Sequence, residues 1–170
     1  MKKLISIFVA ISLLISGIMF SGFSKRLIKS TIHCDSINFA MKEGDEEEFL
    51  RLVSDKKFNL NQYDALKIFE FFEGIRRTPL QETCYLENPY YVEKLLENGA
   101  DPNVILPRGR TCLIDIVALN PKYYNEYHYE IVRLLVEYGT DISIKDQDGF
   151  AAYDYAVKYN RTELYDLLKP

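Results

Sequence analysis

The sequence predicts an all-α protein, a solenoid of stacked helix-turn-helix units with short hairpin turns and about four units including the caps. Three observations predict this architecture. The stretch LLENGADPN at residues 95–103 has a counterpart in LLVEYGTDIS at residues 134–143. The threonines that open these units, Thr78 and Thr111, lie 33 residues apart. Apolar residues within each unit follow helical spacing, so each unit should contain helices whose apolar faces pack against the adjacent unit.

The first helix of a unit has a recognisable start. Thr78 can cap the helix with its hydroxyl group, and Pro79 suits the first helical position because no amide hydrogen is needed there. Apolar or small residues expected to face a neighbouring unit then follow: Leu80, Thr83, Cys84, Leu113, Ile116 and Val117.

The second helix of a unit carries an apolar stripe and a stop signal. Gly99 and Gly139 fit the left-handed residue that ends a helix. No single helix pair can bury its own stripe, but stacked pairs can. The stripe consists of Val92, Leu95, Leu96, Ile131, Val132, Leu134 and Leu135.

Weaker units flank the two clear ones. A third unit begins at residues 149–156, and a degenerate opening unit occupies residues 38–53. In the opening unit, the acidic run at residues 44–48 is expected to start a helix, because acids complement the helix dipole there. The predicted organisation is a signal peptide or membrane anchor at 1–24, a lead-in segment at 25–35, and a repeat domain at 36–170. Within that domain we expect a cap at 36–60, an insert at 61–76, and repeats at 77–108, 109–148 and 149–170.

These segments resemble the ankyrin-repeat family over roughly residues 36–169. The matching stretches are RGRTCLIDIV, DQDGFAAYDYA, YVEKLLENGADPN and YEIVRLLVEYGTDI. The chain departs from the family pattern at a seven-residue insert, a longer link between Asn61 and Thr78, Lys94 at an apolar position, and Ala151-Ala152 in place of Thr-Pro. A weakened last unit is expected of a capping repeat.

The N-terminal segment is typical of an export signal. Lys2 and Lys3 precede an uncharged apolar run from Leu4 to Phe20, and cleavage is expected after Ser24. The run is nearly as long as the roughly 20 residues that a membrane-spanning helix needs. We therefore expect a periplasmic or extracytoplasmic protein, with an inner-membrane anchor through residues 4–23 as the alternative.

Charge and cysteine content narrow the function. Without residues 1–24 the chain has 19 Lys and Arg against 25 Asp and Glu, a net charge of −6. This excess of acids argues against nucleic-acid binding, which needs cations that neutralise phosphates. The odd number of cysteines, Cys34, Cys84 and Cys112, cannot form a complete disulfide framework. Cys84 is interpreted as a small core hydrophobe, and the redox state of all three stays open.

The sequence contains no signature of catalysis. His33, Cys34 and Asp35 are consecutive, so their side chains point apart and cannot form a relay. The chain has no G-x-S-x-G, no phosphate-binding glycine loop and no Cys/His spacing suited to zinc. We therefore predict a protein that is not an enzyme, with no catalytic residues, no metal site and no cofactor.

Two sets of residues are candidates for partner binding. Arg76, Arg77, Arg108 and Arg110 lie at two adjacent turn tips and could form a basic edge that captures an acidic partner. The alternative is intramolecular pairing with Glu82 and Asp115. The second set is aromatic or apolar and lies on the inner helix faces: Tyr85, Leu86, Leu119, Tyr155 and Tyr159.

The insert NPKYYNEYHY at residues 120–129 is the third candidate. Pro121 is expected to stop the preceding helix. The loop either contacts a partner, because tyrosine offers a large area at little entropic cost, or packs on its own repeat. Its tyrosines are Tyr123, Tyr124, Tyr127 and Tyr129.

Small exported bacterial ankyrin proteins are similar to immunity proteins, which sit outside the inner membrane and neutralise toxins from neighbouring cells. The resemblance implies a protein-binding module that inhibits a secreted antibacterial toxin, such as a type VI phospholipase effector. We expect a monomer or a 1:1 complex. The alternatives are a membrane-anchored scaffold or adaptor and an exported effector that binds a host protein.

Overall fold

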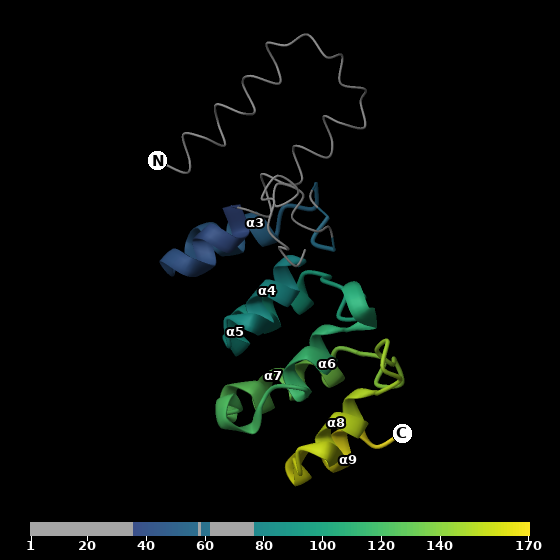
Figure 1. Ribbon diagram of the computed structural model, residues 1–170. Coiled ribbons are helices and arrows are strands. Elements are labelled where there is room, and N and C mark those ends of the chain that lie inside the picture. Colours follow the sequence, from purple (N-terminus) through teal and green to yellow (C-terminus); the bar gives the residue numbers. More distant parts are fainter. Residues whose placement is uncertain (1–35, 58, 62–76) are drawn as a thin grey trace, which may run out of the picture.

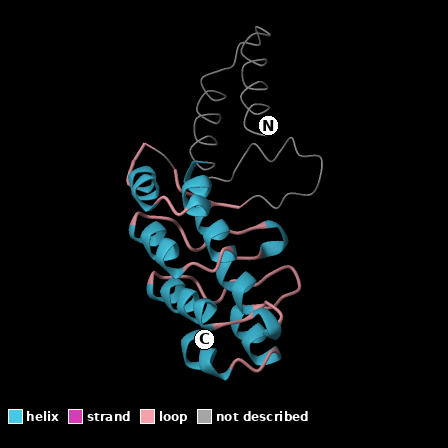
Figure 2. Ribbon diagram, turned by 90° about the vertical axis from the view of Figure 1, so that its left-hand side faces the viewer, coloured by secondary structure: helices cyan, strands magenta, loops and turns pink. Residues whose placement is uncertain are grey.

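The helices of the chain form successive pairs that stack along one direction (Figure 1). The computed structural model describes residues 36–57, 59–61 and 77–170. Figure 2 shows that helices and loops make up this part of the chain, without a strand. Residues 36–43 are helical, and the later elements are α3 (Glu46–Val53), α4 (Pro79–Tyr85), α5 (Pro89–Glu97), η2 (Pro107–Gly109), α6 (Cys112–Val117), η3 (Pro121–Tyr123), α7 (Glu126–Glu137), α8 (Ala152–Lys158), η4 (Thr162–Leu164) and α9 (Tyr165–Leu168).

Several predicted segments lie outside the described residues. These are the signal peptide or anchor at 1–24, the lead-in segment at 25–35 and all but the first residue of the insert at 61–76. Among the residues that are described, no helix has the length and apolar character needed to cross a bilayer. The all-helical stacked architecture itself is confirmed.

Local signals start and stop the helices where the sequence predicts. The amide of Gln81 donates to Thr78 Oγ1 at 3.3 Å, while Gln81 Oε1 accepts from the Thr78 amide at 2.9 Å. This reciprocal capping satisfies two amides that the helix itself cannot pair. Asp45 caps α3 in a simpler way by accepting from the Glu48 amide at 3.1 Å. Gly99 has a φ of 89°, the left-handed geometry expected after α5.

The core lies between the stacked pairs. Helix α5 packs against α7, and α4 packs against α6, so each apolar stripe is covered by the neighbouring unit. Leu95 and Ile131 are 0% exposed and Leu134 is 4% exposed. The predicted stripe is therefore the buried interface. Truncating a leucine at such a site to alanine typically costs about 2–5 kcal/mol, so these contacts dominate the stability of the stack.

The closing turns are linked to one another through asparagine side chains. Asn61 Oδ1 accepts from the Asp101 amide at 2.7 Å, and Asn103 Oδ1 accepts from the Asp141 amide at 2.7 Å. One unit thus satisfies a backbone amide in the turn of the next unit. These hydrogen bonds lie at the surface and join the turn of each unit to the turn of the next.

The helix before the insert ends earlier than the sequence suggested. Helix α6 ends at Val117, and Pro121 instead opens the short 3₁₀ turn η3. Asn125 then caps α7 by accepting from the amides of Tyr127 and His128 at 3.0 and 3.3 Å. The prediction that Pro121 itself stops the first helix was therefore wrong by a few residues, since capping at Ala118 ends the helix before the proline is reached.

The two turn tips of the repeats pack backbone against backbone. The Gln147 amide donates to the Arg108 carbonyl at 2.9 Å. Gly109, with a φ of 73°, lies beneath this contact, and a Cβ atom added there would meet Asp146 Cα and the Gln147 nitrogen at 3.2 Å. Glycine is needed at this tip both for its left-handed conformation and for the close approach.

We predict that Gly109→Ala lowers the free energy of unfolding by about 2–3 kcal/mol, because backbone strain and a backbone clash add. Gly149→Ala is a matched control: its φ is 82°, yet nothing lies within 4 Å of the added carbon. It should cost only the strain of about 1–2 kcal/mol. Urea unfolding of both variants measures the difference. Equal losses would contradict the role given to the close approach.

Candidate functional site

The first helices of three successive units form a continuous row, because α4 contacts α6 and α6 contacts α8. We call the side of this row that carries the following charged and aromatic residues the first-helix face. Its members are Lys42 of the preceding cap helix, Arg77, Glu82, Tyr85, Arg110, Asp115, Tyr155, Lys158 and Tyr159.

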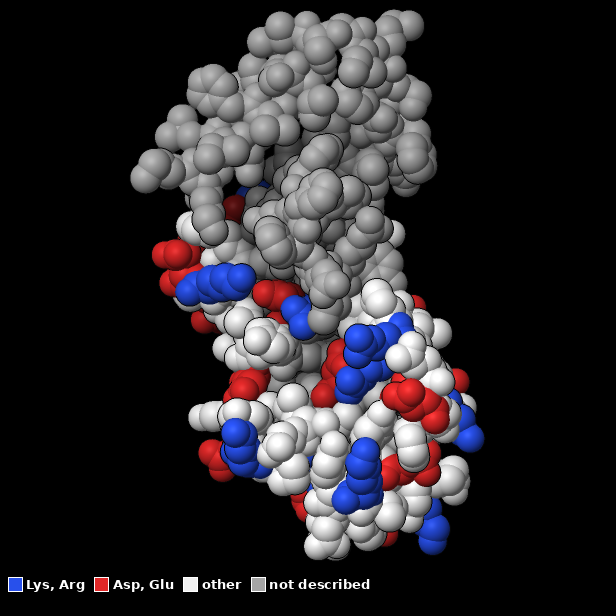
Figure 3. Space-filling view, viewed as in Figure 1, with Lys and Arg blue, Asp and Glu red and all other residues white. Residues whose placement is uncertain are grey.

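The arginines of this face are paired within the chain. Arg77 Nη1 lies 3.6 Å from Glu82 Oε2, and Arg110 Nε lies 2.8 Å from Asp115 Oδ1. Lys42 Nζ approaches the other oxygen of Glu82 at 3.4 Å. The two carboxylates that the sequence offered as intramolecular partners therefore take up both arginines. In Figure 3, basic and acidic groups are likewise interspersed on the described surface.

The charges of neighbouring units act on one another. Burial raises the pKa of Asp115, while the positive charges of Arg110 and Arg77 act in the opposite direction. Arg77 belongs to the preceding unit, so the row Lys42–Glu82–Arg77–Asp115–Arg110 alternates in sign across the stack.

Three of the four arginines of the predicted basic edge lie within the described structure. Arg76 lies outside the described residues. Arg108 is exposed at the turn tip with a φ of 71°, and its carbonyl holds the neighbouring tip. Of the predicted edge, the structure brings Arg77 and Arg110 onto the first-helix face, each beside its own carboxylate.

The predicted aromatic and apolar residues differ widely in exposure. Tyr85 is 67% exposed, and the Arg77 guanidinium lies 4.7 Å from its ring centroid. Leu86 is 37% exposed, whereas Leu119 is half-buried. Tyr155 is nearly covered at 8%. Tyr85 is therefore the large side chain that a partner reaches most readily on this face.

Tyr155 is held in place by a buried hydrogen bond. Its hydroxyl donates to Asp146 Oδ2 at 2.6 Å, which raises the pKa of Tyr155 to about 12. Burial opposes ionisation of Asp146, but hydrogen bonds from Tyr155 and from the amides of Phe150 and Asp148 outweigh it and lower the pKa of Asp146. The ring of Tyr155 is thus a fixed platform rather than a mobile contact.

The insert divides into packed and projecting tyrosines. Tyr123 and Tyr127 are 59% and 53% exposed. Tyr124 packs on its own repeats, with the Arg161 guanidinium 3.6 Å from its ring centroid, and burial raises its pKa to about 12. The local-packing alternative thus holds for Tyr124. The exposed Tyr123, whose ring centroid lies 4.4 Å from the Lys122 ammonium, and the exposed Tyr127 stay candidates for contact with a partner.

Two buried polar residues anchor the insert. The sequence analysis predicted a role for neither of them. His128 is 1% exposed, its Nδ1 accepts from the Asn125 amide at 3.2 Å, and its Nε2 lies 3.6 Å from Glu87. Burial lowers the pKa of His128, and Glu87 opposes that shift. Arg161, 4% exposed, donates from Nη2 to the Leu119 carbonyl at 2.6 Å. Neither residue stands in a motif, so no pattern could have pointed to it.

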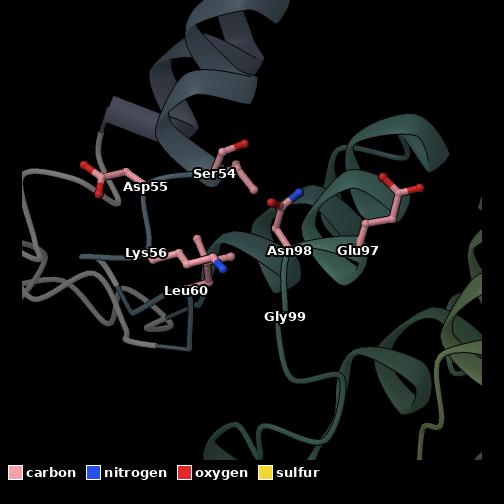
Figure 4. A pocket seen from close by; sticks show the side chains of 8 residues that line it. Ser54, Asp55, Lys56, Leu60, Glu97, Asn98 and Gly99 are labelled. Atoms are coloured by element: carbon pink, nitrogen blue, oxygen red, sulfur yellow. The ribbon is translucent and has the colours of Figure 1, made fainter.

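A cavity of about 360 Å³ lies between the ends of α3 and α5 (Figure 4). The Asp55 carboxylate accepts from the Lys57 amide at 3.1 Å, and Glu97 pairs with Lys94 at 2.7 Å. Figure 4 shows these two carboxylates turned away from each other. The lining therefore offers no converging acid–base pair. Within the part of the chain that is described, no group of His, Cys, Asp and Glu could hold a metal ion.

A disulfide lies beneath the first-helix face. Cys84 of α4 is bonded to Cys112 of α6, with their Cα atoms 6.6 Å apart and both residues buried. Cys84 therefore lies in the core, as predicted, and its redox state, which the sequence left open, is a bond to Cys112 because the stacking register brings the two sulfurs together. Cys34 lies outside the described residues.

We predict that reduction of this bond lowers the free energy of unfolding by about 3–4 kcal/mol, because it closes a loop with a sequence separation of 28. Denaturant unfolding with and without a reductant measures the loss. The control is the double variant Cys84→Ala/Cys112→Ala, whose stability should not respond to the reductant. An equal response of both proteins would contradict the pairing.

Comparisons with known proteins agree with this geometry. A protein of Treponema pallidum (strain Nichols) described as ankyrin repeat-containing is 26% identical over 148 residues, which are 87% of this chain and 44% of that protein. An ankyrin repeat protein of Rickettsia felis is 31% identical over 75 residues, which are 44% of this chain and 32% of that protein. The chain thus spans less than half the length of these curated relatives.

A solved structure shows the same fold. The ankyrin repeat domain of Bcl-3, a member of the IkappaB family, aligns with a TM-score of 0.61 at 19% identity, covering 79% of this chain and 50% of that one. A family model described as ankyrin repeats (three copies) matches residues 80–169, more than half of the chain. The chain therefore belongs to the ankyrin-repeat family.

Proposed function

We propose that this protein binds another protein through its first-helix face and thereby blocks that partner. Ankyrin repeats indicate a protein-interaction module. The observation that carries the proposal is the exposed Tyr85, 67% exposed beside Arg77 on a row of packed helices. Tyrosine and arginine are among the side chains enriched at the energetic centres of protein interfaces. We expect a monomer that forms a 1:1 complex.

The compartment that we propose is extracytoplasmic, with a periplasmic location or an inner-membrane anchor through residues 4–23. The basic and apolar N-terminal sequence supports export. The Cys84–Cys112 bond supports it independently, because disulfides persist in oxidising compartments and are rare in the cytosol.

The partner that we propose is a secreted antibacterial toxin, such as a type VI phospholipase effector, so that the protein acts as an immunity protein. The export-type N-terminal sequence together with the ankyrin-repeat surface supports inhibition by binding. A membrane-anchored scaffold is the second candidate, favoured by the length of the apolar run up to Phe20. An exported effector that binds a host protein is the third. The mass of the mature protein separates the anchored form from the exported ones.

Photo-crosslinking in the native host tests the binding face. A crosslinking phenylalanine analogue in place of Tyr85 is expected to form one discrete adduct with another protein. The matched control replaces Tyr138, which is 40% exposed but caps the second helix α7. Adducts of the same kind at both positions, or at Tyr138 alone, would place the binding surface elsewhere.

A competition assay tests the identity of the partner. Deleting the gene should leave growth in pure culture unchanged and should sharply reduce survival beside toxin-producing kin. Restoring the full gene should rescue survival, whereas a copy that lacks residues 1–24 should not. Survival that stays unaffected in the mixed culture would refute the immunity role and leave protein binding standing.

A further inference from the structure

Lys158 differs from the other cations of the first-helix face because no carboxylate among the described residues lies within 4 Å of it. Arg77 and Arg110 each have such a partner. The Lys158 ammonium lies instead 5.8, 5.7 and 5.5 Å from the ring centroids of Phe150, Tyr155 and Tyr159. A cation held near several aromatic faces is oriented without being neutralised.

Two acids on the same side of the last repeat, Asp154 and Asp146, are engaged in other contacts. Asp154, one helical turn earlier, accepts from the Ala151 amide at 2.8 Å through Oδ2. Asp146 accepts from the Tyr155 hydroxyl and from two backbone amides. The positive charge at the end of α8 is therefore left for an external group, on a chain whose formal net charge is −4.

The rings around Lys158 form a shaped surface. Tyr155 and Tyr159 stack with centroids 6.4 Å apart and an interplanar angle of 19°, and Phe150 tilts against Tyr155 at 5.5 Å. Phe150 is 41% exposed, so an apolar side chain can pack on it. Arg110 lies 5.9 Å from the Tyr155 ring and adds positive potential, although it is paired with Asp115.

We infer that the Lys158 platform, made of Phe150, Tyr155, Lys158 and Tyr159, takes up an aspartate or glutamate side chain of the partner protein. An apolar residue beside that carboxylate packs on the exposed ring of Phe150. The inference rests on the proposed function and adds the chemistry of the partner to it. On the preceding units the arginines are already paired with Glu82 and Asp115, so the last repeat offers the cation of this face that is left for a partner's carboxylate.

The test is a titration of the isotope-labelled full chain with a synthetic peptide, Ac-Ala-Glu-Leu-Asp-Phe-NH2, followed by amide chemical shifts. We expect salt-sensitive shifts at residues 149–159. Lys158→Gln should weaken the affinity about threefold to fivefold, the range of an exposed ion pair. Lys145→Gln, which removes an exposed lysine of the neighbouring turn tip, should leave the affinity unchanged. A control peptide has Gln and Asn in place of Glu and Asp. Its affinity for the wild type should equal the affinity of the acidic peptide for Lys158→Gln.

Three results would overturn the assignment of Lys158: equal affinity of the wild type and Lys158→Gln, shifts confined to other residues, or an absence of binding by the acidic peptide. The spectra report folding directly, so a misfolded variant would be recognised and replaced by Lys158→Met. The titration uses the protein alone. A negative titration would therefore reject only the role of Lys158. A negative crosslinking result at Tyr85 would reject the proposed function.

Discussion

Each helix pair of this chain has an apolar stripe that it cannot cover by itself, and the stacking of the next pair is the constraint on which the rest of the structure depends. Leu95 and Ile131 reach 0% exposure only because α5 and α7 lie against each other. The same stacking sets the separation of the turn tips, so that a Cβ atom at position 109 would come within 3.2 Å of Asp146. A change in register would uncover the stripe and break the tip contact together.

Stacking also explains why the arginines of the first-helix face are paired with carboxylates. Consecutive units place equivalent positions side by side, so a carboxylate at Glu82 or Asp115 falls next to an arginine of its own or the adjacent unit. Such pairs are partly screened and contribute little affinity unless a partner displaces water from them. The net attraction available to a partner therefore comes from aromatic area and from cations without a carboxylate, of which Lys158 is the best placed in the described structure.

The sequence predicted the features that depend on residues close together in the chain. It did not predict those that depend on how one repeat unit is aligned against the next. The cap at Thr78, the stop at Gly99 and the buried stripe are encoded within a few residues of each other, so pattern alone specifies them. The Cys84–Cys112 bond depends on how two units slide against each other. The choice between an exposed and a paired Arg77 was left open for the same reason, since a long side chain selects its partner in three dimensions.

The insert shows how a departure from the repeat is made compatible with binding. Its inward groups, Tyr124 and His128, are fixed by Arg161 and by Asn125, so the added residues do not form a loose loop. Ordering flexible side chains costs free energy when a complex forms, and a loop that is already held avoids part of that cost. Tyr123, the most exposed tyrosine of the insert, thus lies beside side chains that are held in place, and Tyr155 is held by its hydrogen bond to Asp146. Preorganisation of aromatic groups is the property that the insert and the last repeat share, and for the proposed binding function it would favour a specific partner over a promiscuous one.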